Sequence, residues 1–193
     1  MKIMKINLIL RFATLVLLII WRVYWFLHKK EAVIKKPKTE NNFRIIELIM
    51  FNLGSAYVFI NLIGFPMFYF DNLSTQVIGF GLVILGFIQA IVARKTLEDN
   101  WTESFKYQIK KNHELITRGI YKYIRHPIYG AMLLIVPGAL LVSGSYTFIA
   151  VLIIMLFAVE IFALREEEIL IKHFGRKYIE YKKTTKKFIP FVY

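Results

Sequence analysis

The sequence predicts an all-α integral membrane protein with about five transmembrane helices. Hydrophobic residues make up 57% of the 193 residues and aromatic residues 16%, which is typical of membrane proteins and excludes a disordered chain. The apolar residues gather into five stretches, and a helix needs about 20 such residues to cross the hydrocarbon core. Lys and Arg are confined to alternate connections between these stretches, as expected for a chain that crosses a membrane repeatedly.

The five stretches differ in length. In order, they cover residues 6–28, 44–70, 74–97, 127–143 and 146–164. The first three are long enough to span, and the first is too long, and too interrupted by Arg11 and Arg22, for a cleaved signal peptide. The fourth is near the lower limit, and we expect it to form a tight hairpin with the fifth, turning at Ser143-Gly144-Ser145.

The basic residues predict an orientation. Lys and Arg number six in residues 29–44, none in 71–76, eight in 94–125, none in 143–146 and eight in 165–193. Basic loops stay in the cytoplasm, so we expect the N-terminus outside, the C-terminus inside and, in a prokaryote, location in the cell membrane. The net charge of +13 would then face anionic lipids, and this disfavours nucleic-acid binding.

The chain divides into two functional parts. Residues 1–97 are expected to form three transmembrane helices, and residues 98–193 an interfacial segment, a transmembrane hairpin and an amphipathic tail. The polar segments of the second part flank its two spans on the same side, so we place any chemistry there. The absence of Cys excludes thiol nucleophiles and disulfides. The four His residues form no i, i+4 pair, so no metal site is predicted.

A cluster of unusual residues precedes the fourth stretch, in the sequence IYKYIRHPIYG (residues 120–130). Pro127 suits the first turn of a helix, and the free N–H groups and positive dipole end at such a start favour an anion. Arg125 adds a planar fork for a carboxylate or phosphate. Taken singly, Arg125, His126 and Tyr129 read as a topology charge, a locally satisfied side chain and an interfacial aromatic. Together they predict a binding site.

A run of acids ends the fifth stretch. Glu168 has Lys172 at i+4, which predicts a surface pair. Glu166 and Glu167 have no basic residue at that spacing, so we expect them to meet a cation from elsewhere, unless they form an ordinary solvated helix end. Glu160 lies about 10 Å before Glu167 on the same face. It is either a functional acid or the partner of Arg22 in a structural pair.

Residues 113–129 (HELITRGIYKYIRHPIY) and 166–190 (EEEILIKHFGRKYIEYKKTTKKFIP) resemble the isoprenylcysteine carboxyl methyltransferase family and its phospholipid methyltransferase relatives. The resemblance covers roughly residues 95–193. It implies a multi-pass enzyme with a cytoplasmic-side cofactor pocket for S-adenosyl-L-methionine, which leaves as S-adenosyl-L-homocysteine. It also implies a hydrophobic or lipidated acceptor that enters from the bilayer. The family's cofactor contacts match His113, Glu114, Leu115, Ile116, Tyr121, His126, Pro127, Ile128, Tyr129 and Glu166.

Catalytic roles are expected for Glu167, Arg165 and Arg125. The prenylcysteine enzymes carry a substrate-binding Arg four residues before the cofactor-binding Glu, where this chain has Phe162. Arg165 is the nearest replacement, about 60° around the helix. This departure weakens the specific expectation of a prenylcysteine carboxylate and leaves the cofactor expectation intact.

Other functions stay open at this point. A carboxylate is the preferred acceptor, because it is already ionised, and the amine of a phospholipid or a small thiol are the alternatives. A membrane reductase that uses a nicotinamide cofactor shares the R-H-P-x-Y element and is a rival from another enzyme class. A non-catalytic membrane protein with a vestigial site is the third hypothesis.

Overall fold

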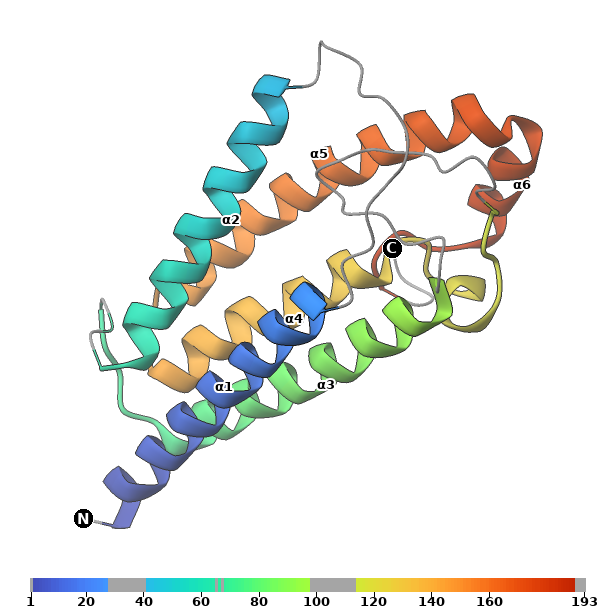
Figure 1. Ribbon diagram of the computed structural model, residues 1–193. Helices are drawn as coiled ribbons and strands as arrows, with labels where there is room; N and C mark the ends of the chain where they lie inside the picture. The colour runs from blue at the N-terminus through green and yellow to red at the C-terminus, as the bar shows by residue number, and fades with distance from the viewer. Residues whose placement is uncertain (1, 28–40, 65, 67, 98–113, 190–193) are drawn as a thin grey trace.

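The computed structural model describes residues 2–27, 41–64, 66, 68–97 and 114–189. The helices are α1 (Lys2–Leu27), α2 (Asn41–Leu62), α3 (Leu73–Leu97), the 3₁₀ helix η4 (Gly119–Lys122), α4 (Pro127–Ser143), α5 (Phe148–Phe174) and α6 (Arg176–Thr184) (Figure 1). Within the described residues there is no β-strand, only two isolated bridges. The predicted all-α class is confirmed.

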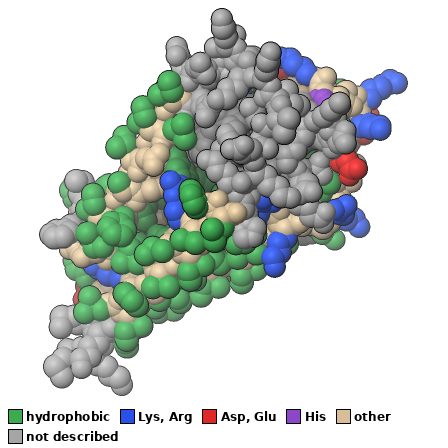
Figure 2. All heavy atoms as spheres, viewed as in Figure 1, with side chains coloured by type: hydrophobic (Ala, Val, Ile, Leu, Met, Phe, Trp, Pro, Cys, Tyr) green, Lys and Arg blue, Asp and Glu red, His purple; other side chains and the backbone are tan. Residues whose placement is uncertain are grey.

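Each predicted apolar stretch corresponds to a helix. Three helices have the length and composition of membrane spans: Ile6–Leu27, Leu73–Leu97 and Phe148–Phe174. Two shorter apolar helices, Leu48–Leu62 and Pro127–Ser143, accompany them. Outside the grey residues, hydrophobic side chains predominate along the visible helices, and most visible charges gather where α6 lies (Figure 2). The protein is therefore an integral membrane protein, while five crossings and their orientation stay predictions.

Two helix ends differ from the sequence expectation by eight and ten residues, and the other bounds differ by at most four. The second stretch was expected to run to residue 70, but α2 ends at Leu62. Gly64 follows with a φ of 120°, which a right-handed helix does not allow, and Pro66 comes two residues later. The fifth stretch was expected to end at residue 164, but α5 continues to Phe174. The charged residues that follow residue 164 end the apolar run, but they do not end the helix, because Arg, Glu and Lys are good helix formers.

α4 lies at the centre of the bundle, where α1, α2, α3 and α5 all contact it (Figure 1). Its closest neighbour is α3, and glycines make this approach possible. A Cβ on Gly79 would lie 2.6 Å from the carbonyl oxygen of Gly138, and one on Gly138 would lie 2.8 Å from that of Gly79. Small residues let membrane helices pack backbone to backbone. The predicted division at residue 97, just after α3, concerns function and stays a prediction.

The predicted hairpin between α4 and α5 is present. Gly144 ends α4 with φ 75°, a conformation that glycine adopts without strain. Its carbonyl accepts a hydrogen bond from the Phe70 amide at 2.7 Å, and Arg11 donates to the Ser143 carbonyl at 2.5 Å. These contacts tie α1 and the segment that precedes α3 to the turn.

At the opposite end of the bundle, Arg125, His126 and Pro127, which we call the R-H-P segment, lie against the C-terminal part of the chain. After α6 the chain returns and runs beside residues 123–126. Arg125 and His126 donate backbone hydrogen bonds to the carbonyls of Lys186 and Lys187 at 2.9 and 3.0 Å. Phe188 lies so close to α4 that a Cβ on Gly130 would be 2.6 Å from its carbonyl oxygen. This pairing positions the residues described next.

Candidate functional site

Charged side chains from three segments meet at the start of α4. Glu167 Oε1 of α5 lies 2.5 Å from Arg125 Nε and 3.3 Å from His126 Nε2. The other ring nitrogen, His126 Nδ1, is 3.6 Å from Glu166 Oε2, and Lys182 Nζ of α6 is 2.6 Å from Glu167 Oε2. We call these five residues the ionic cluster. It confirms that both acids find cations from elsewhere in the chain.

The two acids of the ionic cluster differ in access. The Glu167 side chain is 2% exposed and faces three basic groups, whereas that of Glu166 is 38% exposed. A buried carboxylate is stable only when it is paired and hydrogen-bonded. Glu167 therefore organises Arg125, His126 and Lys182, and this geometry favours a positioning role. The Glu166 side chain stays partly accessible from outside the cluster.

His126 is buried between the two carboxylates. Burial by itself lowers the pKa of His126, but the hydrogen bonds and negative charges of Glu166 and Glu167 outweigh it and raise the pKa above 6.5. The imidazolium form therefore persists to a higher pH than in an unstructured chain. Its ring stacks beside Tyr129, with centroids 5.6 Å apart.

The raised pKa of His126 predicts a pH-dependent stability. Because the folded state holds this proton more tightly, the stabilisation is complete below about pH 6.5 and is lost as the pH rises through the folded-state pKa. We expect the Tm difference between wild type and His126→Gln, measured in detergent, to shrink as the pH is raised from about 6 to 9. A difference that stays constant or grows with pH contradicts this assignment.

The other predicted contacts occupy the same end of the bundle. Pro127 begins α4, as predicted, and Ile116 and Tyr121 are buried together beside Ala93. Burial, followed by the charge of Glu166, raises the pKa of Tyr121 well above its ordinary value, so the phenol stays neutral. Ile128 and Leu115 are half-buried, Glu114 and Arg165 are exposed, and His113 lies outside the described residues.

Two predicted pairings have different outcomes. Lys172 Nζ lies 2.7 Å from Glu168 Oε1, as the i+4 spacing predicts. The Arg22–Glu160 pair is wrong, because Glu160 forms its ion pair with Lys187 of the C-terminal segment. The guanidinium of Arg22 lies over the ring of Phe51 instead, 5.0 Å from the centroid. Equal depth in two helices does not make their side chains face each other.

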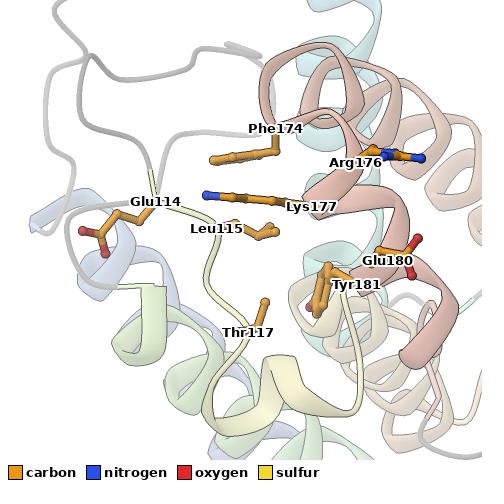
Figure 3. A pocket seen from close by; sticks show the side chains of 8 residues that line it. All are labelled: Glu114, Leu115, Thr117, Phe174, Arg176, Lys177, Glu180 and Tyr181. Carbon is orange, nitrogen blue, oxygen red and sulfur yellow. The ribbon is translucent and has the colours of Figure 1, made fainter.

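A pocket of about 780 Å³ opens between residues 114–117 and the junction of α5 with α6 (Figure 3). Its lining comprises Glu114, Leu115, Thr117, Phe174, Arg176, Lys177, Glu180 and Tyr181. The Lys177 side chain extends from α6 toward the Glu114–Leu115 segment, and the Phe174 ring lies beside it (Figure 3). The Tyr181 hydroxyl donates to the Tyr121 carbonyl at 2.7 Å and so joins the pocket wall to η4.

The pocket contains the predicted Glu114 and Leu115 together with residues that the sequence interpretation missed. Phe174, Lys177 and Glu180 belong to the second resembling segment, but nothing local marks them. The amphipathic pattern of α6, which buries Tyr178 and Tyr181 and exposes the basic face, is the signal that could have indicated them. Binding pockets for small molecules typically occupy about 300–1,000 Å³, and the volume of this pocket lies within that range.

Comparisons with known proteins show which family this chain resembles. The family model for phospholipid methyltransferases matches residues 74–177. A protein-S-isoprenylcysteine O-methyltransferase B from Arabidopsis thaliana is 31% identical over 118 residues, which cover 59% of this chain and 58% of the relative. A phosphatidylethanolamine N-methyltransferase from Scheffersomyces stipitis is 34% identical over 80 residues, which cover 40% of this chain and 9% of the relative.

A solved structure shares the fold. The eukaryotic intramembrane Ras methyltransferase, an isoprenylcysteine carboxyl methyltransferase, superposes with a TM-score of 0.55 at 20% identity, covering 82% of this chain and 55% of that one. The chain thus spans little more than half the length of the plant relative and of the solved structure. The region that the family model matches, residues 74–177, includes the start of α4, the ionic cluster residues of α5 and much of the pocket wall. The expected resemblance is confirmed, and this chain belongs to the phospholipid methyltransferase family.

Proposed function

We propose that this protein is an S-adenosyl-L-methionine-dependent membrane methyltransferase that acts on the carboxylate of a hydrophobic or lipidated acceptor. The observation that carries the proposal is the meeting of Arg125 and His126 with Glu166 and Glu167, two segments forty residues apart. This cluster and the pocket share α5 and α6 as a wall. The curated relatives are methyltransferases by name.

The residues present fit the methyl donor. S-adenosyl-L-methionine has an ammonium group, a ribose diol and an adenine ring, and it supplies a methyl group on a positively charged sulfur. The exposed carboxylate of Glu166 would hold the ammonium. In the pocket, Glu180 would accept hydrogen bonds from the ribose and Phe174 would pack against the adenine. Leu115 and Glu114 form the opposite wall.

The ionic cluster makes a carboxylate the better acceptor. A carboxylate is ionised at neutral pH and needs no base, whereas an amine must lose a proton before it attacks. The acids expected to serve as that base, Glu160 and Glu167, are both paired with cations. The chain's contribution is therefore to hold two reactants in line, which can supply about 7–11 kcal/mol when the geometry is ideal.

The orientation and the partners are part of this proposal. The site would face the cytoplasm, with the N-terminus outside, because the basic connections lie at this end of the chain's spans. Anionic lipids would contact the basic face of α6 beside the pocket, where Lys183 is exposed. The acceptor would enter from the bilayer.

The test of the function is a labelling experiment. Purified full-length protein in lipid nanodiscs is incubated with methyl-labelled S-adenosyl-L-methionine and N-acetyl-S-farnesylcysteine or, separately, phosphatidylethanolamine vesicles. We expect a base-labile label on the prenylated carboxylate, because methyl esters hydrolyse in base. A base-stable label on phosphatidylethanolamine would support the amine alternative, which the yeast relative favours. The reductase alternative is tested separately by thermal unfolding. A Tm raised by NADPH, with no rise for S-adenosyl-L-homocysteine, would indicate a reductase.

Neighbouring acids provide a matched test of donor binding. We expect Glu166→Gln to weaken binding of S-adenosyl-L-homocysteine about tenfold or more, because a charge-assisted hydrogen bond to the ammonium is lost. Glu168→Gln makes the same chemical change two residues along α5, at an exposed surface pair with Lys172, and should change affinity less than about twofold. Isothermal titration calorimetry measures both, and equal effects would contradict the assignment of Glu166.

A further inference from the structure

An ion pair, which we call the deep pair, lies nearer the start of α5 than the ionic cluster does. Glu160 pairs with Lys187, whose side chain is 9% exposed, while the Glu160 side chain is 30% exposed. Glu160 lies within the candidate span Phe148–Phe174. Charged groups at such a position are costly, and a buried ion pair is weak support for stability. The pair therefore calls for a functional explanation.

The pair lies beside a surface that lipid can reach. One helical turn from Glu160 along α5, Leu156 and Leu164 are 45% and 49% exposed, and Phe157 is 70% exposed. On the other side, Val159 and Ala163 are buried against Tyr129 and Phe188. Glu160 thus marks the border between the lipid-facing side of α5 and the packed interior. A polar group on a membrane-dissolved molecule could approach the pair at this border.

The spacing along α5 relates this pair to the donor side. Glu160, Glu167 and Phe174 follow one another at intervals of seven residues, so they share one helix face at steps of about 10 Å. The first belongs to the deep pair, the second to the ionic cluster and the third to the pocket. A donor that extends from the pocket to Glu166 and an acceptor held at the deep pair would therefore meet beside the ionic cluster.

Lys187 is anchored to the site through its backbone. Its carbonyl accepts the His126 amide hydrogen bond at 3.0 Å, so the residue stays beside the R-H-P segment whatever its side chain contacts. A change of partner at the ammonium group would leave this backbone contact in place. Its present partner, Glu160, is the more exposed of the two side chains.

We propose that Lys187 binds the reactive carboxylate of the acceptor and that Glu160 competes with that carboxylate for the same ammonium group. This inference rests on the proposed function and names the acceptor subsite. During transfer, a carboxylate oxygen forms the new O–CH₃ bond while the C–S bond breaks, its electron pair goes to sulfur, and no proton moves. The ester product is neutral, so it loses its attraction to Lys187, and Glu160 takes the ammonium back. The pair thus favours binding of the acid and release of the ester.

The test is equilibrium binding of tritiated N-acetyl-S-farnesylcysteine and of its methyl ester to the full-length protein saturated with S-adenosyl-L-homocysteine. We expect wild type to prefer the acid about tenfold or more, since a charged hydrogen bond is at stake. Lys187→Met should abolish the preference and Lys187→Arg should keep it. Glu160→Gln should tighten binding of the acid, because the internal competitor is gone.

A purely structural ion pair gives a different pattern. Loss of either partner would then change binding in the same direction, and such a result overturns the inference. So does a wild type that binds acid and ester equally while S-adenosyl-L-homocysteine binds normally. A wild type that fails to bind S-adenosyl-L-homocysteine, measured separately by calorimetry, overturns the proposed function and this inference with it.

Discussion

Replacing Glu167 by Gln is expected to destabilise the protein by about 3–5 kcal/mol and to reduce methyl transfer at least about a hundredfold. The substitution preserves shape but removes the negative charge that faces Arg125, His126 and Lys182. The Arg125 side chain is only 9% exposed, so its charge would be left without compensation in a poorly solvated place. Thermal unfolding in detergent and the labelling assay measure the two effects.

A double substitution separates charge balance from the loss of a contact. Arg125→Met alone should also be strongly destabilising, because it leaves Glu167 with a weaker set of partners. The combined Glu167→Gln and Arg125→Met protein should lose less stability than the sum of the two single losses, as expected for coupled neighbours. If Glu167→Gln lowers stability by less than about 1 kcal/mol, the carboxylate does not organise the site.

The second large effect is expected in the contact between α3 and α4. Gly79→Ala would place a Cβ 2.6 Å from the Gly138 carbonyl oxygen and 2.6 Å from the Leu141 Cβ. Because the first of these is a backbone atom, the helices must move apart, and overpacking of this kind costs about 1–3 kcal/mol or more. A lower Tm in detergent is the expected result. Methyl transfer should fall as well, since α4 carries the R-H-P segment at its start.

The same helix supplies the control. A Cβ on Gly81 meets nothing within 4 Å, and Ala is favoured over Gly in a helix by about 1 kcal/mol. Gly81→Ala should therefore leave the Tm unchanged or raise it. If Gly79→Ala behaves like Gly81→Ala, the close approach of α3 to α4 is not the contact described here.

Much of the helical architecture followed from local pattern. The five apolar stretches, the start of α4 at Pro127 and the turn at Gly144 were all predicted, because hydrophobicity, proline and glycine act within a few residues of the chain. The Glu168–Lys172 pair followed from helical spacing for the same reason. The end of α2 was misplaced, because an apolar run was read through the helix break before Gly64 and Pro66.

The family resemblance indicated two segments of the site, residues 113–129 and 166–190, but it did not show how their side chains meet. Sequence reasoning expected Glu166 and Glu167 to find a cation, but the division of labour between them depends on burial, which brings Glu167 to Arg125 and leaves Glu166 partly open. Lys182 and the pocket residues Phe174 and Lys177 were not singled out, since their roles depend on α6 folding back at Gly175.

The amino-acid sequence by itself determined a membrane-embedded helical chain that carries a family motif at one end, because apolar runs and motifs are properties of the order of residues along the chain. Only the tertiary structure decided which charges neutralise one another. Glu160 illustrates this: its sequence position suggested Arg22, and the returning C-terminal segment supplied Lys187 instead. Ion pairs in a bundle are set by which helix faces turn toward each other, and that information comes from packing around α4.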